Sequence, residues 1–388
     1  MLGYLIAICA MIVWHLFCRN QKNGKQQFLI GMAVFMTLFY GLRGWGVGSD
    51  TYSYIVMFQE DGSQNYDNLW EYMWDEKSPA FVLSEWLFYK LLPIPQLWLI
   101  ATSAFFFFIF SWFIGKYSSD SFFSYFIFFT IFGTFQMTGL RQSCAMAVLM
   151  LAFDQIQNRR LIPYLLLAGL AYLFHKSALV FLPFYFICRR KVTKFDIPIL
   201  LIAVIFIYGN RTTIFDFIKS FTSYDYFDQL NHGEPINFSI MIYSATLLSL
   251  ILCIFLRLAK EEEAKKLYII ENPPKKQTAY LTSSLKKLAP KNWIRQRLKK
   301  DSEMIIYSQY ANAMILASLF MPIVAVNGAV RRIVMYFAMY MCLMIPKAFY
   351  TVFDKQARTM MKVALMCLLS FLLLRGIGNS SYAYRLFF

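Results

Sequence analysis

"RQSCAMAVLMLAFDQIQNRRLIPYLLLAGLAYLFHKSALVFLPFYFICRR" occupies residues 141–190 and decides the fold class of this chain. It holds three apolar runs, at 142–156, 161–174 and 176–188, and most of its charged residues fall between or at the ends of these runs. Continuous apolar runs are typical of helices buried in lipid, whereas a membrane β-barrel alternates apolar and polar residues. The stretch therefore predicts several membrane helices in succession.

The whole chain repeats this pattern. Of its 388 residues, 59% are hydrophobic and 15% are charged, whereas a water-soluble domain carries about 25% charged residues. The apolar segments are residues 1–17, 27–42, 96–115, 121–137, 142–156, 161–174, 176–188, 196–209, 237–257, 304–325, 332–350 and 362–378. We therefore expect an all-α polytopic membrane protein, a single transmembrane domain over residues 1–388 with about 12 transmembrane helices (about 10 to 13).

Several of these segments are short for a membrane crossing. A helix of about 14 residues reaches about 21 Å, and the hydrocarbon core of a membrane is about 30 Å thick. Short or broken helices are tolerated where protein or a water-filled cavity covers their ends. The sequence therefore predicts a cavity within the helical domain.

Charge orients the chain in the membrane. If every apolar segment crosses once, five groups of Lys and Arg fall on the same side: residues 19–25, 159–160, 189–194, 257–303 and 355–362. By the positive-inside rule that side is cytoplasmic, which also explains the net charge of +16 without a nucleic-acid partner.

The opposite side is acidic. Residues 41–95 carry eight Asp and Glu against three Lys and Arg, a net charge of −5. We expect both termini outside, an outer (periplasmic) loop at 41–95 with an interfacial helix near Trp86 and Tyr89, a second outer loop at 210–236, and a basic cytoplasmic loop at 258–303 that lies on anionic lipid.

Several cations fall at the outer ends of apolar segments, in the leaflet where positive charge is depleted. They are Arg43, Arg141, His175, Lys176, Arg331 and Arg332. For any one of them alone, a side chain that reaches up to the interface is an alternative explanation. Their convergence from four segment ends favours an anion site, because an Arg fork suits phosphate oxygens and the helix that Arg141 and Gln142 open favours an anion at its N-terminus.

The acidic loop begins with a glycine-rich stretch, "YGLRGWGVGSDTYSY", residues 40–54. Its glycines allow close backbone approach. Asp50 is the carboxylate nearest to an arginine here, so it is predicted either to act as a base on a sugar hydroxyl or to orient Arg43. Glu60, Asp61 and Asp67 are the rival carboxylates. Tyr54 and the other aromatic residues of the loop suit sugar rings or a membrane interface.

Four blocks of the sequence resemble the EpsG/Wzy-type family of O-antigen and exopolysaccharide polymerases. They are "RGWGVGSDTYSYIVMF", "TGLRQSCAMAVLMLAF", "YLLLAGLAYLFHKSALVFLP" and "NGAVRRIVMYFAMYMCLMIP". The likeness extends from about residue 43 to residue 346, and its most specific part is the pairing of RQ with HKSAL.

The resemblance implies a glycosyltransferase with a fold like that of the C-type membrane glycosyltransferases. It would join undecaprenyl-pyrophosphate-linked repeat units at the outer face of the bacterial inner membrane, without a cofactor and without a metal. Its partners would be the lipid-linked glycan donor and acceptor, membrane lipids and a chain-length regulator. The predicted catalytic residues are Asp50, Arg141 and His175; the predicted substrate-binding residues are Arg43, Gln142, Lys176, Arg331, Arg332 and Tyr54.

Other classes of membrane protein also need buried cations. A flippase or transporter of lipid-linked oligosaccharides would spread them through the membrane depth or show a repeat, whereas here they gather on one face. An O-antigen ligase, or a sugar acyltransferase with His175 as base, remains a second enzymatic alternative.

Overall fold

The computed structural model describes residues 1–75, 78–193, 195–220, 260–268, 302–377 and 382–387, together with residues 251, 258 and 271. Regular structure in this part of the chain is helical, apart from one isolated bridge between Arg43 and Leu386. The prediction of an all-α protein is therefore confirmed.

Most of the helices fall on the predicted apolar segments, whereas three lie in the expected outer loop at 41–95. In chain order they are α1 (Leu2–Cys18), α2 (Gly24–Gly41), α3 (Thr51–Ser63), α4 (Tyr66–Asp75), α5 (Pro79–Leu91), α6 (Pro95–Tyr117), α7 (Ser121–Ile127), η1 (Phe128–Phe132), α8 (Gly133–Thr138), α9 (Leu140–Gln157), α10 (Leu161–Phe174), η2 (Lys176–Phe181), α11 (Phe184–Ile187), α12 (Asp196–Gly209), α13 (Arg211–Ser220), α18 (Ser302–Val324), η4 (Gly328–Val330), α19 (Arg331–Ala338), α20 (Met341–Val352) and α21 (Lys355–Ile377).

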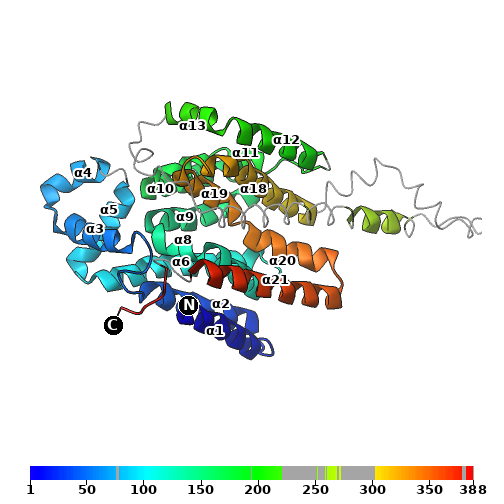
Figure 1. The fold of residues 1–388 in the computed structure, drawn as a ribbon, viewed down its shortest axis with the longest axis horizontal. Helices are drawn as coiled ribbons and strands as arrows, with labels where there is room; N and C mark the ends of the chain where they lie inside the picture. The colour runs from blue at the N-terminus through cyan, green and yellow to red at the C-terminus, as the bar shows by residue number, and fades with distance from the viewer. Residues whose placement is uncertain are drawn as a thin grey trace, which may run out of the picture.

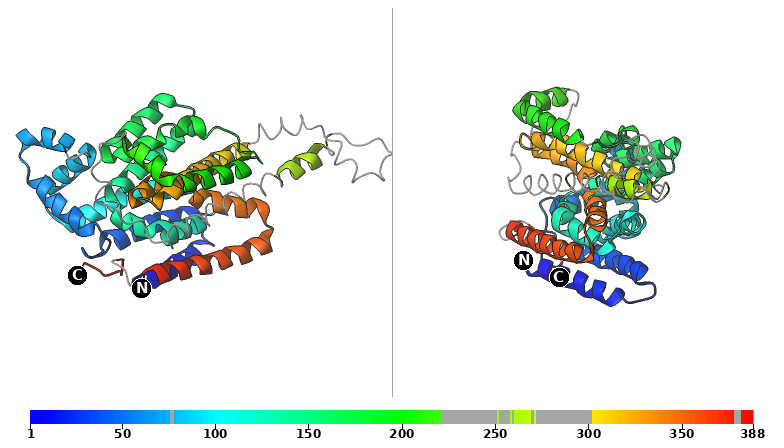
Figure 2. Two further views of the ribbon diagram at one scale, coloured as in Figure 1. Left: turned by 45° about the horizontal axis from the view of Figure 1, so that its top comes forward. Right: turned by 90° about the vertical axis from the view of Figure 1, so that its right-hand side faces the viewer.

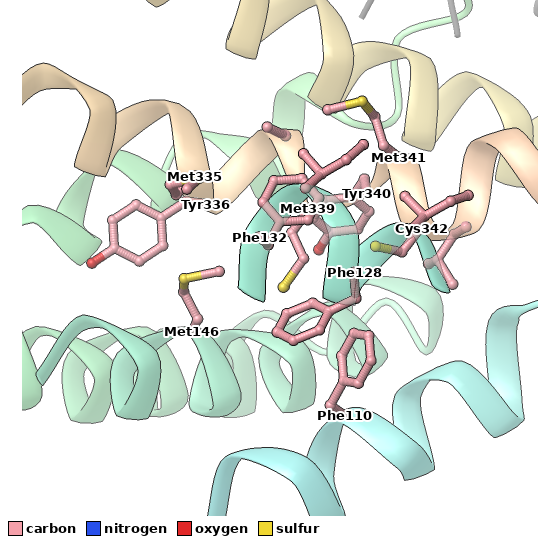
Figure 3. Close-up of a cluster of buried hydrophobic side chains, with 14 of the residues drawn as sticks. Phe110, Phe128, Phe132, Met146, Met335, Tyr336, Met339, Tyr340, Met341 and Cys342 are labelled. Carbon is pink, nitrogen blue, oxygen red and sulfur yellow. The ribbon is translucent and has the colours of Figure 1, made fainter. Parts of the chain in front are cut away.

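Most long helices run side by side along the molecule, and α3, α4 and α5 form a separate group at one end (Figure 1; Figure 2, left). The centre of the bundle is built from α7–η1–α8 and α19–α20: 89% of the first and 83% of the second is buried, against 17% of α21. Aromatic and Met side chains fill this centre (Figure 3). A π-helical turn, η1, interrupts the first of these central helices.

Helix length limits how many of these elements cross a membrane alone. By length and composition, the described residues contain 4 candidate membrane-spanning helices, or 5 if the pair α12 and α13, bent by 80°, is one span. Helices α1, α10 and η2–α11 are apolar but shorter. The chain is thus a helical membrane protein, whereas about 12 crossings stay a prediction; segment 237–257 lies almost wholly outside the described residues.

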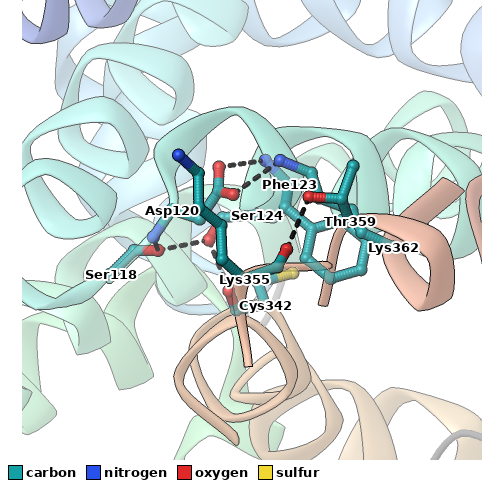
Figure 4. Close-up of polar contacts among 8 residues, drawn as sticks. All are labelled: Ser118, Asp120, Phe123, Ser124, Cys342, Lys355, Thr359 and Lys362. Carbon is teal, nitrogen blue, oxygen red and sulfur yellow. Dashed lines mark hydrogen bonds and ion pairs between the residues drawn. The ribbon is translucent and has the colours of Figure 1, made fainter. Parts of the chain in front are cut away.

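Polar contacts join three of these helices at the end opposite to α3–α5 (Figure 4). The Lys362 Nζ lies 2.6 Å from the Asp120 carboxylate, and Asp120 also accepts the backbone N–H of Phe123 at the start of α7. The Ser124 hydroxyl donates to the Cys342 carbonyl at 2.6 Å. Because these groups satisfy one another, α7, α20 and α21 are tied together without leaving a buried charge unpaired.

The two ends of the bundle are held by different contacts. The end away from α3–α5 holds the ion pairs Lys116–Asp154 and Lys362–Asp120. The other end holds both chain termini, because Tyr4 hydrogen-bonds the Tyr382 carbonyl and residues 385–387 bond the loop after α2. Which end faces the cytoplasm stays a prediction. In the outer loop expected at 210–236, residues 211–220 form α13, and most of the basic loop 258–303 lies outside the described residues.

Candidate functional site

Residues from three separate segment ends meet near α3 and α5. Arg141 and Gln142 lie in the first turn of α9, Arg332 is the second residue of α19, and His175 joins α10 to η2. Arg332 and Arg141 both act electrostatically on the His175 ring. The Gln142 Nε2 donates to the Arg332 carbonyl at 2.5 Å. We call these four residues the cation cluster; their proximity is observed, and their chemical roles stay predictions.

In the described part of the chain, the Arg141 guanidinium contacts a thioether sulfur and an aromatic ring rather than a carboxylate. Its NH2 group lies 3.2 Å from the Met57 sulfur, and its Cζ lies 5.2 Å from the centre of the Phe81 ring. Its Nε is buried and makes no hydrogen bond within the described part of the chain. A buried donor without an acceptor is costly, so this nitrogen marks a place where an acceptor atom of a ligand would be stabilised.

His175 is fixed in orientation by two hydroxyl groups. The Ser177 Oγ lies 2.7 Å from His175 Nδ1 and 3.1 Å from the Tyr336 hydroxyl. When Ser177 donates to Nδ1, the proton of the neutral ring is on Nε2, which then serves as a donor. His175 lies at the junction of α10 and η2. Burial there, together with the charges of Arg332 and Arg141, lowers the pKa of the imidazole, so the ring is neutral at pH 7.

The start of α9 adds backbone donors to the cation cluster. The N-cap residue, Gly139, has no side chain to bond the free N–H groups of the first turn. An uncapped helix start favours an anion through these groups and the helix dipole. Beside it, the Gln142 Oε1 is buried and accepts no hydrogen bond from the residues that the structure describes. The site therefore offers donors for an anion and one acceptor for a hydroxyl.

Two of the other three predicted cations lie on the same elements. Lys176 is the first residue of η2 and is partly exposed. Arg331 begins α19, and its Cζ lies 5.9 Å from the centre of the Phe135 ring. Both are therefore adjacent in the chain to members of the cation cluster.

Arg43 is not part of this cluster. Its side chain is 0% exposed. Its guanidinium donates to the Thr51 hydroxyl at 3.2 Å, to the Met137 carbonyl at 3.3 Å and to the Tyr40 carbonyl. The sequence predicted that Arg43 binds substrate, but in this structure the group is enclosed by protein acceptors. It joins α2, α3 and α8, and its role in substrate binding stays a prediction.

Asp50 stands at the start of α3, where its side chain makes no capping hydrogen bond and is partly exposed. No ion pair joins it to Arg43 in the described residues, so orientation of Arg43 by Asp50 has no support here. Asp50, Tyr54 and Met57 follow a spacing of four and three residues and so share one side of α3. Met57 contacts Arg141, which places Asp50 about 10 Å along the helix axis from that contact.

Tyr54 lies between α3 and α5. It is 8% exposed, and its ring centre lies 5.9 Å from that of Phe81 at an angle of 62°. Phe81 also lies under the Arg141 guanidinium. Tyr54 therefore packs on the same ring that lies under the Arg141 guanidinium.

The loop that carries Arg43 and Asp50 is held on two sides. Gly48 has a φ of +92°, and a Cβ there would lie 2.9 Å from the Met137 carbonyl oxygen, so only glycine fits. Gln96 of α6 donates to the Arg43 carbonyl at 3.2 Å and accepts from Trp45 at 3.0 Å. The loop is therefore built into the bundle rather than being a loose connection.

The C-terminal segment covers the same loop from outside. The Gly44 N–H donates to the Arg385 carbonyl at 2.8 Å, and the Phe387 N–H donates to the Leu42 carbonyl at 3.0 Å. Tyr384 stacks on Phe39 with ring centres 4.2 Å apart. Residues 382–387 thus form a strap across the loop, which no local sequence pattern indicated.

Three further residues near the cluster were missed from sequence. Ser177 and Tyr336 orient His175, and both lie inside the quoted blocks, in HKS and in RRIVMY. Glu85 is a fully buried carboxylate on α5, four residues after Phe81, and it acts electrostatically on Cys144 of α9. Glu85 could have been noticed in the sequence, because it is an acidic residue inside the otherwise apolar run that was assigned to the membrane interface.

Comparison with known proteins gives one match. The family model of the EpsG family matches residues 27–386, nearly the whole chain. No curated protein and no solved structure matches. In the described residues, no group of three or more His, Cys, Asp or Glu side chains is placed to hold a metal ion.

Proposed function

The chain belongs to the EpsG family, and membership in this family indicates a membrane polysaccharide polymerase. We propose that it joins undecaprenyl-pyrophosphate-linked repeat units at the outer face of the bacterial inner membrane. The observation that carries the proposal is the meeting of Arg141, His175 and Arg332 from separate segment ends. Such a group of donors suits a pyrophosphate.

A void of about 10 Å³, room for about one water molecule, lies in the apolar interior beside the cluster. It is lined by Met146, Met150, Phe181, Met339 and Tyr336, and Figure 3 shows Tyr336, Met146 and Met339 around this region. Tyr336 also carries the hydroxyl that bonds Ser177 beside His175. This void is too small for a hydrocarbon chain, so the lipid of the proposed substrate would lie outside it.

The proposed reaction is glycosyl transfer. The acceptor hydroxyl attacks the anomeric carbon of the donor, the bond from that carbon to the pyrophosphate oxygen breaks, and the lipid pyrophosphate leaves. Arg141, Arg332 and the Nε2–H of His175 stabilise the negative charge that grows on the leaving group. Asp50 takes the proton of the acceptor hydroxyl. The unpartnered Gln142 Oε1 accepts a hydrogen bond from a sugar hydroxyl.

Deletion of the gene tests the class of function. We expect surface glycans that carry single repeat units, resolved on a gel, because capping by one unit needs no polymerase. Loss of all repeats from the surface would indicate a flippase, and long chains that are not attached to their acceptor would indicate a ligase; either pattern contradicts the proposal.

Thiol labelling tests the orientation. In intact cells, cysteine replacing Ser63, an exposed residue of α3, should react with a membrane-impermeant reagent, whereas cysteine replacing Lys286 or Arg295 should be protected. The wild-type chain gives the background, since Cys9 and Cys367 are exposed. Labelling at Lys286 from outside would overturn the orientation and place the site on the cytoplasmic face.

A further inference from the structure

Helix α4 exposes two tryptophans on the group of helices that projects from one end of the bundle (Figure 1; Figure 2, left). Trp70 is 69% exposed and Trp74 is 49% exposed. Their ring centres lie 5.9 Å apart, with the rings at 68° to each other. Tryptophan buries a large area when it meets a partner, so a pair left exposed calls for an explanation.

The exposure is not the result of a loosely attached helix. On the other side of α4, Leu69 and Met73 are 5% and 7% exposed and pack with Val82 of α5. The Tyr72 hydroxyl donates to the Asp61 carboxylate at 2.8 Å and ties α4 to α3. The inner side of α4 is therefore fixed, and the tryptophans are held facing outward.

Two carboxylates share the exposed side. Since each helical residue turns about 100°, Asp67, Trp70, Glu71 and Trp74 fall within an arc of about 100°, and Leu69 and Met73 fall on the other side. Asp67 and Glu71 are both exposed. The outward surface of α4 is therefore a pair of aromatic rings flanked by carboxylates, which we call the Trp–acid face.

A membrane surface is a poor partner for the Trp–acid face. Anionic lipid headgroups attract Lys and Arg rather than Asp and Glu. The same group of helices already has an apolar stripe of another kind: Leu83, Leu87 and Leu91 of α5 are 36%, 47% and 79% exposed and recur every four residues. The leucine stripe suits lipid, whereas the Trp–acid face does not.

A glycan suits it. The face of a sugar ring presents C–H groups that pack on aromatic rings, and its hydroxyls donate hydrogen bonds to ionised carboxylates, which are acceptors only. The helix is also connected to the reaction site, since α4 packs on Val82 and the neighbouring Phe81 lies under Arg141. A chain attached at the cation cluster would pass α5 before it reached α4.

We propose that the Trp–acid face binds the growing polysaccharide several sugars away from the bond that is formed. The proposal rests on the proposed function, because the ligand is the product of that reaction. This surface would hold long chains near the site and leave single repeat units unaffected.

The test compares lipid-linked substrates of one repeat and of many repeats on the purified full-length protein. In the double variant Trp70→Ala, Trp74→Ala, we expect the KM for the long chain to rise roughly 10-fold, because two aromatic contacts with the glycan are lost. The KM for the single repeat should stay within about two-fold. The variant Trp70→Phe, Trp74→Phe should keep most of the preference for long chains.

The matched control is Leu83→Ala, Leu87→Ala, which removes two exposed apolar side chains at the same spacing on α5 and should leave the long-chain KM unchanged. A second pair, Asp67→Asn with Glu71→Gln, should raise the long-chain KM; a lowered KM with tighter vesicle binding would show a membrane anchor and overturn the proposal. Equal effects on both substrates would also overturn it. Absence of any transfer by the wild-type protein would instead contradict the proposed function.

Discussion

Replacement of Arg141 by alanine is expected to lower polymer synthesis by roughly 10²–10³-fold, the loss typical of removing one donor aimed at developing charge. The structure gives the reason: the guanidinium lies on Phe81 and Met57, has an unpartnered buried Nε, and meets no carboxylate in the described residues. Its charge is therefore available to a ligand. The measurement is the rate of chain extension on purified lipid-linked repeat units.

Two further variants separate charge chemistry from packing. Arg141→Lys should restore little activity, because a point charge does not replace the two-pronged fork of a guanidinium. Arg211→Ala is the matched control: Arg211 also opens a helix and lies over an aromatic ring, Tyr208, at 4.6 Å. It should retain wild-type activity. If Arg141→Ala, expressed at the normal level, made as much polymer as the wild-type protein, the side chain would only reach the membrane interface and would not bind the donor.

Substitution of Asp50 by asparagine is expected to reduce the rate by about 10²–10⁴-fold, the usual contribution of a general base. Asparagine keeps the shape of the side chain, and donor binding should survive because Asp50 lies about 10 Å along α3 from the Arg141 contact. The measurement pairs the extension rate with the KM for the donor: the maximal rate falls while KM for the donor stays.

Glu60→Gln is the matched control for Asp50→Asn, because Glu60 is an exposed carboxylate on the same helix. Asp61 is less suited to the control, since it accepts a hydrogen bond from Tyr72 and is 2% exposed. Full activity in Asp50→Asn would show that the good leaving group needs no base at that position, or that another carboxylate serves. A loss of only a few fold would remove Asp50 from the catalytic residues.

Glu85 shows how sequence and structure divide the information about the site. From sequence, its helix was assigned to the membrane interface, since Trp86 and Tyr89 are amphipathic aromatics. In the structure Tyr89 packs on Phe58, Trp86 donates to the Gln64 carbonyl at 3.3 Å, and Glu85 is fully buried. The stripe that remains exposed is leucine. The sequence of α5 does not show which of its faces is buried, because that depends on how the neighbouring helices pack against it.

The sequence by itself determined the helical class, the positions of the apolar helices and the segment ends that carry cations. These follow from local composition and periodicity, because each apolar run must satisfy its own backbone hydrogen bonds as a helix. The family also follows from the sequence, through blocks such as HKSAL and the match over residues 27–386.

Only the tertiary structure decided which of the cations belong together. Arg141, His175 and Arg332 lie close together because α9, η2 and α19 pack at one end of the bundle. Arg43 instead donates hydrogen bonds to the carbonyls of Tyr40 and Met137. The contacts of the C-terminal strap with the loop after α2 were also visible only in the tertiary structure. Except for the contact of Arg43 with Tyr40, these contacts join residues that are tens to hundreds of positions apart, and the spacing of residues along a chain does not specify them.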